Sequence, residues 1–115
     1  MQIATIIGTR PEIIKMAPLI PLLDKYFDHK LIFTSQHYSK NMVDVFFDEL
    51  KIRTPDVFLR TNISEIKKLE ASIYRILKKD NPEWVAVYGD TNSTLASARA
   101  AKRFGKKLIH FEAGL

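Results

Sequence analysis

The sequence predicts an α/β fold, a doubly wound parallel sheet, and three observations support this. Short apolar segments rich in β-branched residues alternate along the chain with longer segments that have the apolar period of a helix. Such alternation is typical of a parallel sheet with right-handed crossovers and helices on both faces. Three of the four glycines, Gly8, Gly89 and Gly114, follow expected strands, where tight turns into helices need them. The 115 residues contain no internal repeat, and we expect them to belong to one domain.

The expected strands are apolar runs that end in glycine or in polar residues. They lie at 2–7, 30–34, 84–87 and 107–111. Residues 52–62 contain Pro55 and show no clear period, so we interpret them as a loop with a candidate short strand at 57–59.

The first helix begins with a capping box, in which Thr9 precedes Glu12 by three residues. Pro18 and Pro21 should interrupt this helix before a second short helix at 22–27. The other expected helices lie at 41–50, from 62 or 64 to about 79, and at 95–104.

Apolar residues at helical spacing define the expected buried faces. On 41–50 they are Met42, Val45, Phe46 and Leu50, and on the following helix they are Ile66, Leu69, Ile73, Ile76 and Leu77. The alanine-rich helix at 95–104 is expected to end at Gly105.

The composition excludes several classes of protein and site. The chain is 46% hydrophobic and 27% charged, as is usual for a globular protein. It has no cysteine, which excludes disulfides, thiolate metal sites and cysteine nucleophiles. No apolar run is long enough to span a bilayer, and no signal peptide is visible at the start. We therefore expect a cytoplasmic protein with no membrane partner.

The net charge is +5, from 18 basic and 13 acidic residues. The densest basic group lies at and beyond the end of the last helix, where cations complement the helix dipole. It consists of Arg99, Lys102, Arg103, Lys106 and Lys107. We interpret this group as a solvated face rather than a polyanion-binding patch, and we expect no nucleic-acid partner.

Polar side chains follow the expected strands at the edge where an open α/β sheet binds its ligands. After the four strands in turn come Arg10 and Lys15, then Gln36 and His37, then Asp90, and then Glu112, with His110 inside the last strand. This edge therefore combines cations, acids and histidines. No metal-ligand spacing, G-x-G-x-x-G motif or P-loop accompanies them, so we expect no metal.

Asp90 and Glu112 form the most informative pair, because one short helix joins their strands. Adjacent strands would place the two strand ends roughly 4.8 Å apart. Repulsion between the carboxylates would raise the pKa of one of them, which is a way to hold an acid and a base in one site. Arg10 and Lys15 would suit a phosphate or a second anionic group.

Each of these residues also has a structural interpretation. Asp90 can cap its helix, Lys15 can extend along apolar surface to solvent, and His37 is more often a turn residue than a catalyst. We interpret His110 as structural because it lies within its strand. Glu112 has the weakest structural interpretation, since an acid directly after a buried strand gains little from that position.

Four segments in chain order carry a family resemblance. They are 8–12 with 15–18, 36–38 with 41–42, 89–95, and 110–115. Together they resemble the non-hydrolysing UDP-N-acetylglucosamine 2-epimerases, and the resemblance covers the entire chain. Four linked motifs are a specific signal, whereas any one of them alone would be weak.

The resemblance implies a GT-B-like fold of two Rossmann-like domains with the active site in the cleft. Residues 1–115 would be an incomplete N-terminal Rossmann-like domain, and the second domain would be absent from this chain. The family interconverts UDP-N-acetylglucosamine and UDP-N-acetylmannosamine by eliminating UDP to a 2-acetamidoglucal and adding it back. The resemblance therefore implies a nucleotide-sugar isomerase in cell-surface polysaccharide biosynthesis, and an inactive isolated 115-residue chain.

By motif match, the resemblance also assigns site residues. Asp90 and Glu112 are the candidate acid and base, and Arg10, Lys15, Asp90 and Glu112 are the candidate substrate-binding residues. His37 is a candidate ligand contact. The resemblance implies a UDP-sugar substrate, no cofactor, no metal and a homodimer in the full-length protein.

The chain departs from the family in two places. Relatives often carry a glycine-containing segment with a Glu-Gln pair before the third helix, and 59–64 lacks it. The family also continues with Arg beyond the position of Leu115, and full-length relatives are much longer.

Two other interpretations stay open. One is an epimerase of a different UDP-acetamido sugar, such as a uronic-acid derivative. The other is a truncated, non-catalytic module that binds a partner through an open sheet edge. A flavodoxin-like or receiver-type domain would need an acidic cluster after the first strand, and Thr9, Arg10 and Pro11 supply none.

Overall fold

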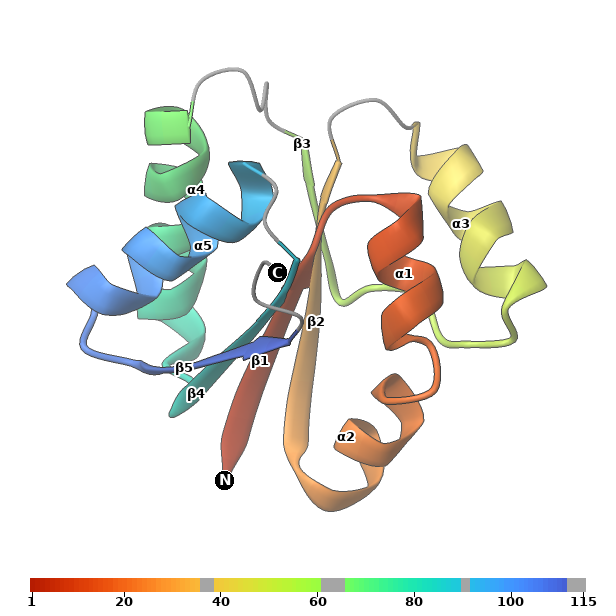
Figure 1. Cartoon of the computed structure of the whole chain (residues 1–115), viewed down its shortest axis with the longest axis horizontal. Helices are drawn as coiled ribbons and strands as arrows, with labels where there is room; N and C mark the ends of the chain where they lie inside the picture. Colours follow the sequence, from red (N-terminus) through yellow and green to blue (C-terminus); the bar gives the residue numbers. More distant parts are fainter. Residues whose placement is uncertain (36–38, 61–65, 90–91, 112–115) are drawn as a thin grey trace.

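The structure is a computed structural model, and it describes residues 1–35, 39–60, 66–89 and 92–111. Within these ranges the chain alternates between strands and helices (Figure 1). The strands are β1 (Gln2–Ile7), β2 (Asp28–Ser35), β3 (Val57–Arg60), β4 (Trp84–Tyr88) and β5 (Lys107–Phe111). The helices are α1 (Arg10–Met16), α2 (Ile20–Tyr26), α3 (Lys40–Glu49), α4 (Ile66–Asp80) and α5 (Asn92–Arg103).

The described strands pair in parallel in one sheet, in the order β3-β2-β1-β4-β5. Helices α1, α2 and α3 cover one face of this sheet, and α4 and α5 cover the other (Figure 1). The predicted doubly wound α/β fold is therefore confirmed, and the candidate strand at 57–59 forms as β3.

Side chains on the two faces of the sheet form two separate cores. The core under α4 and α5 consists of Ala4, Ile6, Ile32, Leu69, Ile73, Leu77, Val85, Val87, Ala96, Ala100 and Ala101. The core under α1, α2 and α3 consists of Ile7, Ile13, Met16, Ile20, Leu31, Phe33, Val43 and Phe47. The Phe33 ring meets the Phe47 ring edge-on at a centroid distance of 6.0 Å. β1 contributes to both cores, because alternate side chains of a strand point to opposite faces.

The predicted break between the first two helices is confirmed, with residues 17–19 turning between α1 and α2. Pro21 lies in the first turn of α2, where a backbone N–H would have no helical partner, so α2 begins at Ile20 and not at Leu22. α3 begins at Lys40 and is capped by Ser39, whose hydroxyl accepts a hydrogen bond from the N–H of residue 42 at 3.2 Å.

The prediction for the buried face of α3 is partly wrong. Met42 and Val45 are 45% and 53% exposed, and Val43 and Phe47 are buried instead. Five of the six residues at 42–47 are apolar, so two overlapping stripes fit helical spacing. The packing of Phe47 against the sheet selects one of them.

The predicted face of α4 is confirmed at Leu69, Ile73 and Leu77, which are fully buried, and the side chain of Ile66 lies outside the described part of the chain. Its N-cap candidates, at 62 and 64, lie outside the described residues. α5 packs on α4 through small buried side chains. It is followed by Gly105 with φ +73, in the left-handed region that a glycine cap requires.

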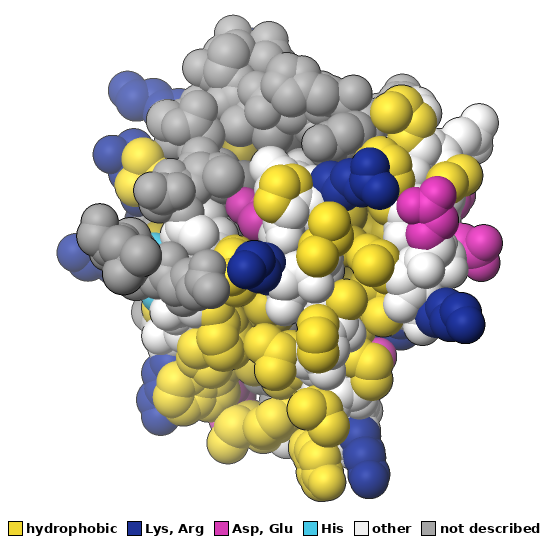
Figure 2. All heavy atoms as spheres, turned by 45° about the vertical axis from the view of Figure 1, so that its right-hand side comes forward, with side chains coloured by type: hydrophobic (Ala, Val, Ile, Leu, Met, Phe, Trp, Pro, Cys, Tyr) yellow, Lys and Arg dark blue, Asp and Glu magenta, His cyan; other side chains and the backbone are white. Residues whose placement is uncertain are grey.

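The surface of the described chain carries hydrophobic and basic side chains in different places. On the face that carries α1, α2 and α3, hydrophobic side chains gather over the lower half, and Lys and Arg side chains are scattered around them (Figure 2). At the end of α5, Arg103 pairs with Glu70 at 2.9 Å and lies over the Tyr74 ring. At least one side chain of the basic group thus makes its contacts within the chain.

None of the described helices combines the length and apolarity that a membrane crossing requires.

A polar cluster ties α2, β2 and the segment before β3 together near the amino-terminal ends of the strands. The fully buried His29 side chain has Nδ1 2.8 Å from Asp24 Oδ1 and Nε2 2.7 Å from Thr5 Oγ1. Since an ionised carboxylate only accepts, Nδ1 carries a proton, and the Thr5 hydroxyl donates to Nε2 of the neutral ring. Arg53 donates to Asp24 at 2.8 and 3.0 Å and to Asp56 at 2.9 Å.

This cluster shifts the titration of two of its members. Burial lowers the pKa of His29 more than its hydrogen bond with Asp24 raises it. The hydrogen bond from Arg53 lowers the pKa of Asp24. In both cases the unfolded chain binds a proton more readily than the folded chain.

Acidification should therefore destabilise the chain through His29. The stability that neutral His29 contributes is complete above its ordinary pKa of 6.5 and is lost as the pH falls toward the lower folded pKa. The loss can reach at most about 1.4 kcal/mol per pH unit for one proton. Asp24 adds to it only below its ordinary pKa of 3.8. Urea denaturation between about pH 7.5 and 5 measures the slope, which should be shallower in His29→Gln. Equal slopes in the two proteins would contradict this account.

Candidate functional site

The order of the strands places a topological switch point between β1 and β4. β2 and β3 extend the sheet on one side of β1, and β4 and β5 extend it on the other. Open α/β sheets bind ligands in the crevice outside the carboxyl ends of such a pair. The backbone that leaves β1 and β4 here forms two turns, which we name the Gly8 turn (residues 8 and 9) and the Gly89 turn (residues 88 and 89). Together with the end of β5, they make the candidate site.

A buried carboxylate, that of Glu12, lies between the two turns. Glu12 Oε1 accepts a hydrogen bond from the Gly8 N–H at 2.7 Å, and only 4% of the residue is exposed. Its Oε2 lies 3.9 Å from the position that a Cβ on Gly89 would occupy. One side chain of α1 thus contacts the backbone after β1 and faces the backbone after β4.

The predicted capping box of α1 forms in modified form. Thr9 has the extended backbone of an N-cap, and its hydroxyl accepts a hydrogen bond from the Glu12 N–H at 3.4 Å. The Glu12 carboxylate reaches one residue further back than a capping box requires, to Gly8. The same side chain therefore starts the helix and holds the turn that precedes it.

Hydrogen bonds hold three successive backbone groups of the Gly89 turn. The Thr94 hydroxyl donates to the Tyr88 carbonyl at 2.7 Å. The Gly89 N–H donates to the Phe111 carbonyl at 3.0 Å, and His110 Nε2 bonds the Gly89 carbonyl. Gly89 has φ +77, a left-handed conformation that glycine adopts without steric cost.

The two predicted cations lie at the two ends of α1. Arg10 is its first residue, and its guanidinium lies 4.8 Å from the Phe46 ring centroid and 3.6 Å from Glu49 Oε2. Its side chain is 51% exposed. Lys15 lies in the last turn and is exposed. Positions five residues apart on an α-helix differ by about 140° beyond a full turn, so the two side chains leave the helix in different directions.

The predicted acids and His37 lie outside the described residues, and their roles stay predictions. The strands that precede Asp90 and Glu112 are nevertheless described. They pair in parallel, with Tyr88 opposite Phe111, so the predicted adjacency of these strands is confirmed.

Sequence reasoning predicts only structural roles for Glu12 and His110, and the structure places both against the site's backbone. The signal for Glu12 is an acid directly before the apolar pair at 13–14, on the face of α1 that is buried. The signal for His110 is a polar residue inside an apolar strand, two positions before a predicted acid. Glu12 contacts the backbone of the turn just before its own helix, and His110 contacts backbone 21 residues earlier in the chain. The spacing of residue types in the sequence does not reveal either contact.

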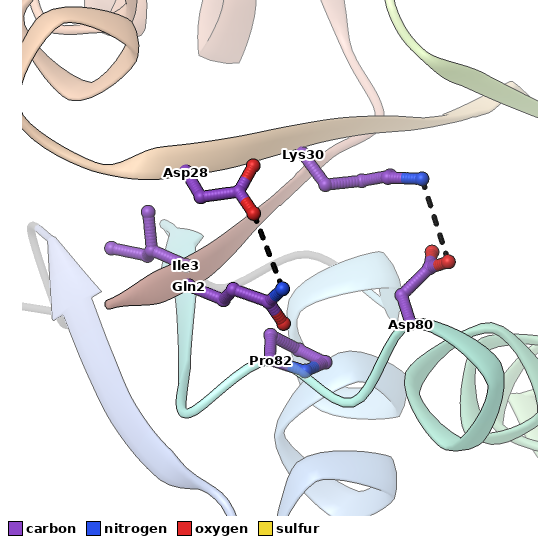
Figure 3. A pocket seen from close by; sticks show the side chains of 6 residues that line it. All are labelled: Gln2, Ile3, Asp28, Lys30, Asp80 and Pro82. Carbon is purple, nitrogen blue, oxygen red and sulfur yellow. Dashed lines mark hydrogen bonds and ion pairs between the residues drawn. The ribbon is translucent and has the colours of Figure 1, made fainter.

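Other parts of the described chain offer weaker sites. No group of three or more His, Asp or Glu side chains within the described ranges could hold a metal ion. A pocket of about 190 Å³ at the opposite edge of the sheet is lined by Gln2, Ile3, Asp28, Lys30, Asp80 and Pro82 (Figure 3). Its polar side chains pair with each other, Gln2 with Asp28 at 3.2 Å and Lys30 with Asp80 at 3.4 Å. We therefore keep the candidate site at the carboxyl edge.

The family model for UDP-N-acetylglucosamine 2-epimerase matches residues 23–115. The UDP-N-acetylglucosamine 2-epimerase of Methanococcus maripaludis is 45% identical over 120 residues, which cover 99% of this chain and 32% of that protein. The UDP-2,3-diacetamido-2,3-dideoxy-D-glucuronate 2-epimerase of Pseudomonas aeruginosa is 37% identical over 121 residues, which cover 100% of this chain and 34% of that protein.

A solved structure extends the similarity to three dimensions. The UDP-GlcNAc 2-epimerase of Methanocaldococcus jannaschii, in complex with UDP-GlcNAc and UDP, aligns with a TM-score of 0.88 and 42% identity. The alignment covers 100% of this chain and 33% of that one. The chain thus spans about a third of the length of these relatives.

Alanine at Gly89 should destabilise the chain through its backbone. The nearest atom to the new Cβ would be Glu12 Oε2 at 3.9 Å, an ordinary contact, so the cost comes from φ +77. We expect the free energy of unfolding to fall by about 1–2 kcal/mol in urea denaturation. Gly105→Ala is a matched control, with φ +73 and nothing within 4 Å, and should lose a similar amount. Unchanged stability in Gly89→Ala would contradict the left-handed turn.

Proposed function

This chain belongs to the UDP-N-acetylglucosamine 2-epimerase family, and from this premise we propose that the whole protein interconverts UDP-GlcNAc and UDP-N-acetylmannosamine. The observation that carries the proposal is the fit of the whole chain, at a TM-score of 0.88, to an enzyme solved with UDP-GlcNAc and UDP. The switch point between β1 and β4 supports it, because a nucleotide sugar would enter the crevice there.

In this proposal Asp90 and Glu112 are the acid and base that exchange the proton at C2 of the sugar. A carboxylate removes that proton, and the electron pair of the C2–H bond forms the C1–C2 double bond. UDP leaves C1 with the electrons of the C1–O bond. The resulting 2-acetamidoglucal takes a proton on the other face of C2 as UDP adds back to C1. The parallel pairing of β4 with β5 supports these roles, since neighbouring carboxyls can hold one proton between them at neutral pH.

Arg10 and Lys15 would stabilise the negative charge on the departing diphosphate. Arg10 suits this role because its partner Glu49 is exposed, and exposed ion pairs contribute little. A phosphate group could replace Glu49 at small cost and accept two hydrogen bonds from the guanidinium. We keep His37 as a candidate contact to the same ligand.

A second substrate has specific support. The Pseudomonas aeruginosa relative named for a diacetamido glucuronate is 37% identical over 100% of this chain. That sugar carries a carboxylate and a second acetamido group, so a substrate panel would separate the two activities. The lower identity, against 45% for the Methanococcus maripaludis enzyme, leaves UDP-GlcNAc as our first choice.

The resemblance also leads us to propose a homodimer, a cytoplasmic location and a role in cell-surface polysaccharide biosynthesis. Light scattering after size-exclusion chromatography measures the molar mass in solution and so tests the homodimer directly. A non-catalytic module remains the contrasting proposal, and the assay below decides between them.

The protein expressed from its complete gene should convert UDP-GlcNAc to UDP-N-acetylmannosamine. In deuterium oxide the product should carry deuterium at C2. The carboxyl group that donates to C2 during re-addition exchanges its own proton with the solvent. Proton NMR of the reaction detects both changes. Binding of UDP-GlcNAc without conversion would favour the non-catalytic module. The 115 residues expressed alone serve as a control and should show no conversion. Conversion by them would contradict the proposal that catalysis needs residues beyond these 115.

Asp90→Asn and Glu112→Gln should each lower kcat of that protein by at least about 100-fold, because each removes a proton-transfer group. Asp48→Asn and Glu83→Gln, at exposed positions away from the site, are the matched controls and should leave kcat unchanged. Circular dichroism checks that the fold persists. Near-normal turnover in Asp90→Asn and in Glu112→Gln would remove both residues from the mechanism.

A further inference from the structure

The backbone of the Gly89 turn consists of two peptide groups that are held in different ways. The first contains the Tyr88 carbonyl and the Gly89 N–H, which are held by Thr94 at 2.7 Å and by the Phe111 carbonyl at 3.0 Å. The second begins with the Gly89 carbonyl and leads into residue 90. Among the described groups, the hydrogen bond to this second carbonyl comes from His110.

The second peptide group needs an external contact because glycine does not restrain it. A residue with a Cβ limits rotation about its own backbone bonds, whereas glycine permits a wide range of conformations. Gly89 has φ +77, and the bonds on the first peptide group do not set its ψ. Among the described groups, the contact that holds this peptide group is therefore the hydrogen bond from His110 to the Gly89 carbonyl.

We propose that His110 is a positioning residue that sets the direction in which the chain enters Asp90. The inference rests on the proposed function, in which Asp90 exchanges a proton with the sugar. Proton transfer is sensitive to the position of the carboxylate, so a freely rotating peptide group would slow turnover more than it would weaken substrate binding.

The chemistry of the contact fits a constant support rather than a switch. A carbonyl only accepts hydrogen bonds, so His110 Nε2 carries a proton. The neutral tautomer with Nε2–H and the imidazolium both make this bond. His110 is also exposed and lies on β5, the last strand in the order of the described sheet. Its replacement therefore leaves both hydrophobic cores intact.

The test compares two replacements of similar length in the protein expressed from its complete gene. His110→Gln keeps an N–H donor at the distance of Nε2, and His110→Met removes it. We expect His110→Met to lose roughly 10- to 100-fold in kcat with a KM close to that of the parent protein. His110→Gln should retain most of the activity, and both variants should keep the melting temperature of the parent. Lys107→Gln, on the same strand, is the control for a changed exposed side chain.

Two patterns of activity would overturn the proposal. Full activity in His110→Met would show that the hydrogen bond is dispensable. An equal loss in His110→Gln and His110→Met would show that the ring matters and the donor does not.

A second measurement keeps the inference independent of the epimerase assignment. In this 115-residue chain, ¹⁵N NMR should show a protonated Nε2 on His110. The ¹³C shift of the Gly89 carbonyl should change in His110→Met and stay constant in Lys107→Gln. If the parent protein fails to epimerise but these shifts appear, the proposed function fails and the contact stands. An unprotonated Nε2, or an unchanged Gly89 carbonyl, overturns the positioning role.

Discussion

β1 and β4 pair in parallel although four helices and two strands lie between them along the chain. This pairing creates the switch point, because the sheet then grows through β2 and β3 on one side and through β4 and β5 on the other. It brings two glycine turns together that have no local reason to meet. Glu12 can then bond the Gly8 N–H while facing Gly89, and the end of β5 can hold the Gly89 turn from the other side.

Buried polar groups occur at both edges of the sheet, and they differ in what they support. A buried carboxylate or imidazole is costly unless hydrogen bonds replace the lost water. At the amino edge, Asp24, His29 and Arg53 satisfy one another and fasten α2 to β2 and to the segment before β3. At the carboxyl edge, the buried Glu12 and the exposed His110 instead bond main-chain groups of the turns.

The fold could be predicted because apolar periodicity and glycine placement report directly on strands, helices and turns. The neighbouring positions of β4 and β5 followed from the single helix between them, and the pairing confirms them. Contacts that depend on the register between distant segments could not be predicted in this way. Arg10 rests on Phe46 and Glu49 of α3, which sequence spacing does not connect to it. The buried face of α3 was predicted only in part for a related reason, since two apolar stripes fit the helix equally well and the sheet selects one.

The position of β1 also has a consequence for the order of events in folding. Parallel strands far apart in sequence pair only after a large loss of chain entropy, so such contacts form slowly. The carboxyl ends of β1 and β4 become neighbours only once that contact has formed. A ligand bound there would bind the completed sheet and not the separate halves, and by mass action it would favour the folded chain. Its concentration would then govern the proteolytic lifetime of the protein as well as the occupancy of the site.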